Sequence, residues 1–129
     1  MIAVKDLNKS FGKKHILHDV SIEFLRGKIN LIIGASGSGK SVLTKCIVGL
    51  HEVDTGNIEF DGRDFVNMNF ADRKEIRKEI GMLFQGSALF DSLTVEENVK
   101  FPLEMYTKMN EKEILDRVNF CLNLSLIHI

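Results

Sequence analysis

Apolar and polar residues alternate with a period of two in the early part of the chain. Residues 20–24 read VSIEF, in which the three apolar side chains would share one face of a strand. Residues 2–7 begin a similar strand, and residues 57–60 form a short one before the turn signal Asp61-Gly62. This part of the chain is therefore predicted to hold strands with one buried face.

Two other short runs are mainly apolar. Residues 29–33 read INLII and are bounded by Gly34, and residues 80–84 read IGMLF. A continuous apolar run of this length is typical of a strand that is buried on both faces of a sheet. Both runs are predicted to be buried strands.

After Ser41 the apolar positions repeat with the period of a helix. One face of this predicted helix carries Val42, Leu43, Cys46, Ile47 and Leu50. Gly49 and the HEVDTG segment that follows would end it. Residues 69–79 are polar and are predicted to form a second helix.

The last third of the chain carries two signals for helix starts. Thr94 with Glu97 forms a capping box that opens a short helix, which Pro102 is expected to end or kink. Asn110 with Glu113 opens a last helix in the same way. The apolar stripe of that helix is Ile114, Leu115, Val118, Cys121 and Leu122.

This order of elements predicts an α/β protein with an antiparallel part at its N-terminal end. The 129 residues, 44% of them hydrophobic, are enough for the core of one domain. A net charge of −1 gives no sign of the basic surface that nucleic acids or anionic membranes require. No signal peptide and no membrane-spanning run is seen. Cys46 and Cys121 lack metal-ligand spacing and are predicted to be buried, reduced thiols.

A glycine-rich segment between the strand at 29–33 and the next helix carries the clearest chemistry. Residues 34–41 read GASGSGKS and fit G-x-x-x-x-G-K-[ST], the phosphate-binding loop also called Walker A. The alternative is a glycine-rich turn that binds nothing. A strand before the loop and an amphipathic helix after it are the context that phosphate binding requires.

Each residue type in the loop has a physical reason. Glycines let the backbone turn sharply and approach the phosphates, so that successive N–H groups form an anion nest. The helix N-terminus adds its positive dipole end, Lys40 adds a cation, and the Ser41 hydroxyl can ligate Mg²⁺. The predicted phosphate-binding residues are Gly34, Ala35, Ser36, Gly37, Ser38, Gly39, Lys40, Ser41 and Val42.

Over nearly its whole length the sequence resembles the ATP-binding subunits of ABC transporters. The resemblance rests on DLNKSFGKKHILHDVSIEFLRGK, on the loop, on GLHEVDTGNIEFDG, on IGMLFQGSALF and on LTVEENVKFPLE. It implies a P-loop NTPase fold in which an antiparallel β portion joins a RecA-like core, with ATP and Mg²⁺ as cofactors. It also implies that Phe11 stacks on adenine, although a core phenylalanine is the alternative. Gln85, which alone would be an ordinary loop residue, is implied to reach Mg²⁺ and the attacking water as a catalytic residue.

The segment MLFQGSALFDSLTVEENVKFPLE is similar to one branch of that family, the Mla-type ATPases that work with MCE proteins in phospholipid transport. Two positions depart from the common loop. Ala35 stands where many relatives have proline, which we expect to be harmless. Val42 replaces a common threonine, which removes a hydroxyl near the α-phosphate but leaves the backbone N–H.

Several family motifs are absent from the sequence. There is no LSGGQ-like signature motif, no later strand ending in Asp-Glu, and no histidine in a switch-loop context, so the four histidines are predicted to lie on the surface. Residues 1–123 are therefore interpreted as the N-terminal part of a nucleotide-binding domain, truncated before its helical subdomain is complete. Residues 124–129, LSLIHI, match one reading frame of a transposon end used as a sequencing adapter and are predicted to be non-native; a natural strand is the alternative. We expect negligible ATP hydrolysis and exposed apolar patches.

These expectations combine into one functional hypothesis. The resemblance implies a homodimeric, cytoplasmic ATPase, peripheral on the inner face of the membrane, that binds MgATP and drives a transmembrane permease and an MCE-type partner in lipid transport. One alternative is another ABC importer or exporter branch. Another is a naturally short, non-catalytic nucleotide-binding module.

Overall fold

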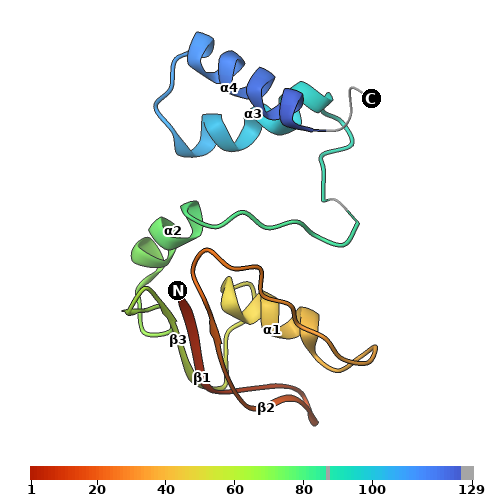
Figure 1. Cartoon of the computed structure of the whole chain (residues 1–129), viewed down its shortest axis with the longest axis vertical. Helices are drawn as coiled ribbons and strands as arrows, with labels where there is room; N and C mark the ends of the chain where they lie inside the picture. The colour runs from red at the N-terminus through yellow and green to blue at the C-terminus, as the bar shows by residue number, and fades with distance from the viewer. Residues whose placement is uncertain (87, 126–129) are drawn as a thin grey trace. The chain divides into compact units, whose positions relative to one another are not determined.

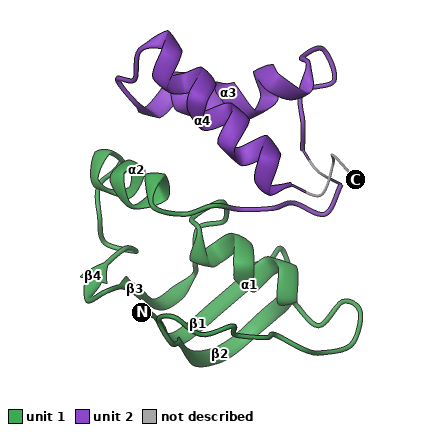
Figure 2. Ribbon diagram, turned by 45° about the horizontal axis from the view of Figure 1, so that its top comes forward, with its two compact units in different colours: residues 1–81 green, residues 82–129 purple. Residues whose placement is uncertain are grey.

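The computed structural model describes residues 1–86 and 88–125 (Figure 1). The chain divides into two compact units, residues 1–81 and residues 82–129 (Figure 2). Each unit is described by itself. Within the described residues, no helix has the length and apolar character needed to cross a membrane.

The first unit is built on an antiparallel sheet. Its strands are β1 (Ile2–Phe11), β2 (Lys14–Phe24), β3 (Thr55–Phe60) and β4 (Arg63–Asp64), in the order β2-β1-β3-β4. In the register, Val4 of β1 lies opposite Ile22 of β2 on one side and Ile58 of β3 on the other. This confirms the predicted antiparallel part and the alternating strands.

Two helices complete this unit. Helix α1 (Lys40–Ile47) follows the glycine-rich loop as predicted, and α2 (Phe70–Lys78) begins at the N-cap Asn69, whose side chain accepts a hydrogen bond from the Asp72 backbone N–H. The sheet and both helices contribute to one core, whose buried members include Val4, Leu7, Leu17, Leu43, Cys46, Ile58, Phe65 and Ile76.

The two apolar runs predicted as buried strands are not strands in this structure. Residues 29–33 and 80–84 have no regular secondary structure. The side chains of Ile29, Leu31 and Ile33 are at least four-fifths exposed. A buried strand needs neighbours that accept and donate its backbone hydrogen bonds. Among the described residues, no strand pairs with either run, so the prediction of buried strands was wrong.

The second unit consists mainly of a helix pair. Helices α3 (Val95–Tyr106) and α4 (Glu111–Leu124) each begin with the predicted capping box. Ile114 and Val118 of the predicted stripe are buried, whereas Leu115 remains 46% exposed. Pro102 lies inside α3, which continues to Tyr106, so proline does not end the helix, and the alternative expectation of a kink stays a prediction.

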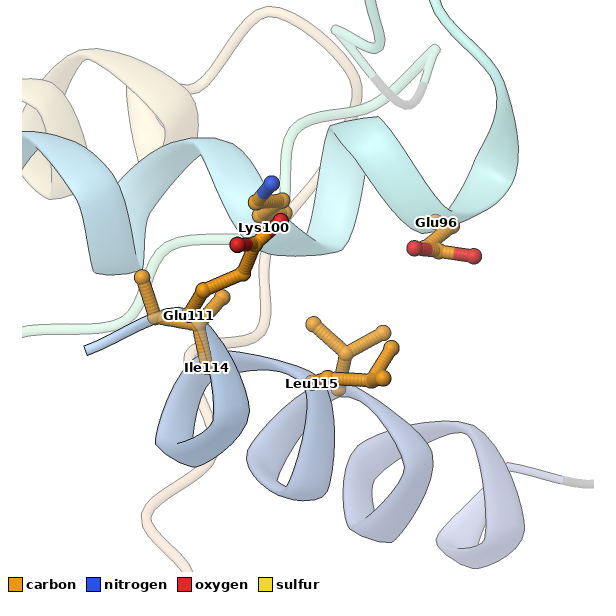
Figure 3. A pocket seen from close by; sticks show the side chains of 6 residues that line it. Glu96, Lys100, Glu111, Ile114 and Leu115 are labelled. Carbon is orange, nitrogen blue, oxygen red and sulfur yellow. The ribbon is translucent and has the colours of Figure 1, made fainter. Parts of the chain in front are cut away.

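A small hollow lies between these two helices. Figure 3 shows Lys100 of α3 and the acidic and apolar side chains around it; the hollow of about 110 Å³ is lined by Glu96, Lys100, Glu111, Ile114, Leu115 and Val118. Leu124 ends α4 and Ser125 is its C-cap, while residues 126–129 of the predicted non-native tail lie outside the described residues.

Candidate functional site

The glycine-rich loop lies directly before α1, and its glycines adopt conformations that other residues rarely take. Gly37 has φ 79° and Gly39 has φ 94°, both in the left-handed region. Gly39 is the N-cap of α1, and its carbonyl accepts a hydrogen bond from the Leu43 N–H at 2.8 Å. The loop therefore enters the helix at a position whose backbone conformation only glycine adopts without strain.

Strand β2 supports the back of this loop. A Cβ atom on Gly39 would stand 3.0 Å from the Cδ2 atom of Leu17 and 3.1 Å from the Cγ2 atom of Ile16. A Cβ on Gly34 would stand 2.7 Å from the Oγ atom of Ser38. Because Gly34 and Gly39 have no Cβ atom, the loop can pack closely against the sheet and within itself.

Lys40 directs its ammonium group into the loop. Its Nζ atom donates hydrogen bonds to the backbone carbonyls of Gly34 and Ala35, each at 2.8 Å. The Ser38 N–H donates to the Ala35 carbonyl at 3.2 Å, which closes a turn of the loop. A positive charge is therefore held at the centre of the loop, where a phosphate would need it.

The electrostatics at this end of α1 favour an anion. A hollow of about 160 Å³ is lined by Gly37, Ser38, Gly39, Lys40, Ser41 and Val42. The first turn of α1 carries no acidic residue, so its dipole and Lys40 act in the same direction. Ser41 is exposed in that turn, where its hydroxyl can ligate a cation held by phosphate oxygens. These residues fit ATP with Mg²⁺.

Phe11 ends β1 in the same unit and is 45% exposed. Its ring meets the ring of His51 edge-to-face, with centroids 5.2 Å apart, and the Nζ atom of Lys9 lies 5.2 Å from the centroid of the Phe11 ring.

The four histidines were predicted to lie on the surface, and this prediction is confirmed for two of them. His15 and His18 are exposed as predicted, His51 is partly buried, and His128 lies outside the described residues.

Gln85 lies in the second unit, in a segment without helix or strand, and its side chain is exposed. The predicted loop residues 34–42 all lie within the first unit, whereas Gln85 belongs to the second, and its role stays a prediction.

Sequence reasoning missed His51, Lys9 and Asp54, which surround the end of β1. The Asp54 carboxylate accepts hydrogen bonds from the Lys9 ammonium at 3.0 Å and from the Ser10 N–H at 2.6 Å. These two bonds hold the pKa of Asp54 below its ordinary value. No local signal in the sequence marks these residues, because His51 and Asp54 contact residues 9–11, which lie about 40 positions earlier in the chain.

Comparisons with known proteins point to one family. The family model described as "ABC transporter" matches residues 17–125. A "Probable ribonucleotide transport ATP-binding protein" of Mycobacterium leprae is 42% identical over 117 residues, which cover 91% of this chain and 34% of that protein. A "Methionine import ATP-binding protein" of Clostridioides difficile is 42% identical over 118 residues, covering 92% and 36% of the two chains. The chain thus spans about a third of the length of these curated relatives.

Solved structures give the same result. A dimeric bacterial ABC transporter cassette superposes with a TM-score of 0.87 at 30% identity, covering 95% of this chain and 56% of that one. A dimeric cassette in a post-hydrolysis state with ADP and Pi gives a TM-score of 0.85 at 29% identity, with the same shares covered. The predicted fold, an α/β ABC ATPase fragment, is confirmed.

Proposed function

The chain belongs to the ABC transporter family, and from this premise we propose that it binds MgATP as part of a transporter ATPase. The observation that carries the proposal is the loop around Lys40. Its ammonium group lies among loop carbonyls at 2.8 Å, directly before the N-terminus of α1. When a triphosphate enters, these carbonyl bonds exchange for stronger bonds to charged phosphate oxygens.

The roles of the remaining residues follow from their positions. The backbone N–H groups of residues 37–42 donate to the phosphates, that of Ser38 in exchange for its bond to the Ala35 carbonyl. The N–H of Val42 takes part although its side chain lacks a hydroxyl. Ser41 ligates the Mg²⁺ that neutralises phosphate charge, and Gln85 is proposed as a second ligand and as the residue that orients water. Phe11 is 45% exposed and is proposed to stack on the base.

We also propose that the 129 residues hydrolyse ATP negligibly by themselves. Efficient hydrolysis needs a group that activates the attacking water beside the outer phosphate, and we propose that Gln85 alone does not supply it. No carboxylate is among the residues described as lining the hollow at the loop. Turnover by the purified chain that is above the buffer background and lost in Lys40→Ala would contradict this.

Nucleotide binding is tested by a calorimetric titration of the chain with MgATP. We expect saturable binding that weakens at least about tenfold in Lys40→Ala, a loss of about 1.4 kcal/mol. Lys45→Ala is the matched control, because it removes the same charge from the last turn of the same helix. Equal affinities for Lys40→Ala and the unaltered chain would reject the proposed role of the loop.

We also propose the partners of the chain and the substrate of the transporter. The chain would form a homodimer that binds a membrane permease. An apolar hollow of about 470 Å³ in the second unit supports a permease contact, and its lining includes Leu89, Phe90, Leu93, Val95, Val99 and Leu122. The likeness of residues 82–104 to Mla-type ATPases supports phospholipid as the substrate.

Import of a small polar solute is the second candidate. The relatives described above favour it, since they are named for ribonucleotide transport and methionine import. The neighbouring genes separate the two. A gene for an MCE protein beside this one would support lipid transport, whereas a gene for a solute-binding protein would support import.

A further inference from the structure

We propose that His51 is a positioning residue for the nucleotide base, because it holds the ring of Phe11 in the orientation that stacks on a purine. This inference rests on the proposed function. The two rings meet at an interplanar angle of 77° with centroids 5.2 Å apart. Such an edge-to-face contact is favourable by about 0.5–1.5 kcal/mol beyond burial, which corresponds to a factor of about 2 to 12.

Phe11 needs such a contact because of its place in the fold. It is the last residue of β1, directly before the hairpin turn at Gly12, which has φ 58°. Little of the core reaches this position, and the ring is 45% exposed. A ring that is free to rotate would lose side-chain entropy when a base stacks on it, and a ring that is already held avoids that cost.

His51 is itself fixed to the helix that carries the phosphate-binding loop. Its backbone N–H and that of Leu50 both donate to the carbonyl of Lys45, at 3.2 Å and 2.8 Å. Arg77 of α2 donates to the carbonyls of Val48 and Gly49 just before it. Helix α1 therefore has the phosphate-binding loop at its N-terminus, and the turn that contains His51 (residues 51–54) follows its C-terminus.

The same turn is tied to the end of β1 a second time. The Asp54 N–H donates to the carbonyl of Asn8 at 3.0 Å. The Asp54 carboxylate accepts hydrogen bonds from the Lys9 ammonium and the Ser10 N–H. The Lys9 ammonium in turn lies 5.2 Å from the centroid of the Phe11 ring. Residues 51–54 thus fix both the backbone that precedes Phe11 and the ring itself.

The experiment compares two probes that share phosphates but differ in the base, MgATP and Mg-tripolyphosphate. For His51→Ala we expect ATP affinity to fall about fivefold, while tripolyphosphate affinity stays within about twofold. His51→Phe keeps an aromatic ring at this position and should restore most of the ATP affinity. His18→Ala is the matched control, since it removes an imidazole that packs on His15 in the same unit.

A double-mutant cycle tests whether His51 acts through Phe11. In a Phe11→Leu background, His51→Ala should weaken ATP binding by less than about 1.5-fold, because no ring remains to be positioned. An equal loss of affinity for both probes in His51→Ala, or an undiminished effect in the Phe11→Leu background, would overturn the inference while the proposed function stands. If the unaltered chain bound neither probe, the proposed function would fail and the inference with it.

Discussion

Gly39 packs so closely on Leu17 that a Cβ atom at residue 39 would stand 3.0 Å from the Cδ2 atom of Leu17. The phosphate-binding loop is therefore not a free surface loop, because its last glycine rests on strand β2 of the antiparallel sheet. This contact joins the two parts of the first unit, the sheet and the loop with its helix.

The contact predicts a difference between two glycines of the loop. Gly39→Ala should lower the free energy of unfolding by about 2–4 kcal/mol, because it combines left-handed strain with overpacking on the sheet. Gly37→Ala should cost about 1–2 kcal/mol, since residue 37 has a positive φ but no atom beyond its chain neighbours within 4 Å of its Cβ position. Urea denaturation of both variants measures the difference. Equal losses would show that strand β2 does not support the loop.

The two cysteines should differ in reactivity. Cys46 is buried in the core, and burial raises the pKa of its thiol. Because the thiolate is the reacting form, a thiol reagent at pH 8 should label the partly exposed Cys121 well before Cys46. Mass spectrometry of a timed labelling reaction measures both sites, and denaturant should make them equal. Labelling of Cys46 as fast as Cys121 in the folded chain would contradict the packing of α1 on the sheet.

The Asp54 carboxylate predicts a dependence of stability on acid. Its pKa is lowered in the folded chain, so its contribution is present above its ordinary value near 3.8 and is lost as pH falls through the folded value. Asp54→Asn should therefore flatten the fall in unfolding free energy below about pH 4. The flattening is partial, because the pKa values of Asp61, Asp64 and Glu79 are lowered as well.

The partner of Asp54 provides the check on that result. Lys9→Met removes the ion pair from its other side and should flatten the same part of the pH curve. Thermal unfolding between pH 3 and pH 7 compares the two variants with the unaltered chain. An unchanged slope in both would show that this ion pair adds nothing to folding.

The capping box of α4 gives a prediction for the second unit. Asn110 accepts a hydrogen bond from the Glu113 N–H at 3.0 Å, and the Glu113 carboxylate accepts one from the Asn110 N–H at 2.7 Å. Asn110→Ala should cost roughly 1 kcal/mol, whereas Asn110→Ser retains the cap. Amide exchange at Glu113 reports the loss directly. Exchange that is as slow in Asn110→Ala as in the unaltered chain would contradict the cap.

Local signals predicted much of the fold. The capping boxes at Thr94 and Asn110 mark α3 and α4 correctly, because each is complete within four residues of sequence. The alternating residues 20–24 mark β2, because their pattern reflects one buried face. The runs at 29–33 and 80–84 failed for the opposite reason. Whether an apolar run becomes a buried strand depends on partner strands, and its own residues do not show whether they are present.

The candidate site divides in the same way. Spacing alone located the loop at 34–41, since the positive φ angles of Gly37 and Gly39 are local requirements. Phe11 was found through resemblance, but the residues that orient it were not. His51 and Asp54 reach the end of β1 only after the chain has passed through the loop and α1, so only the folded structure shows these contacts.

The strand order also determines which contacts can form first while the chain is being synthesised. Strand β1 is synthesised before both of its neighbours, yet it lies between β2 and β3 in the sheet. Its pairing with β2 can form as soon as the hairpin emerges, whereas its other edge stays open until residues 55–60 follow. The hairpin that supports Gly39 is thus available before the phosphate-binding loop is made. The turn that orients Phe11 is made later, so during translation the strand pair that supports Gly39 forms before the contacts that position the Phe11 ring.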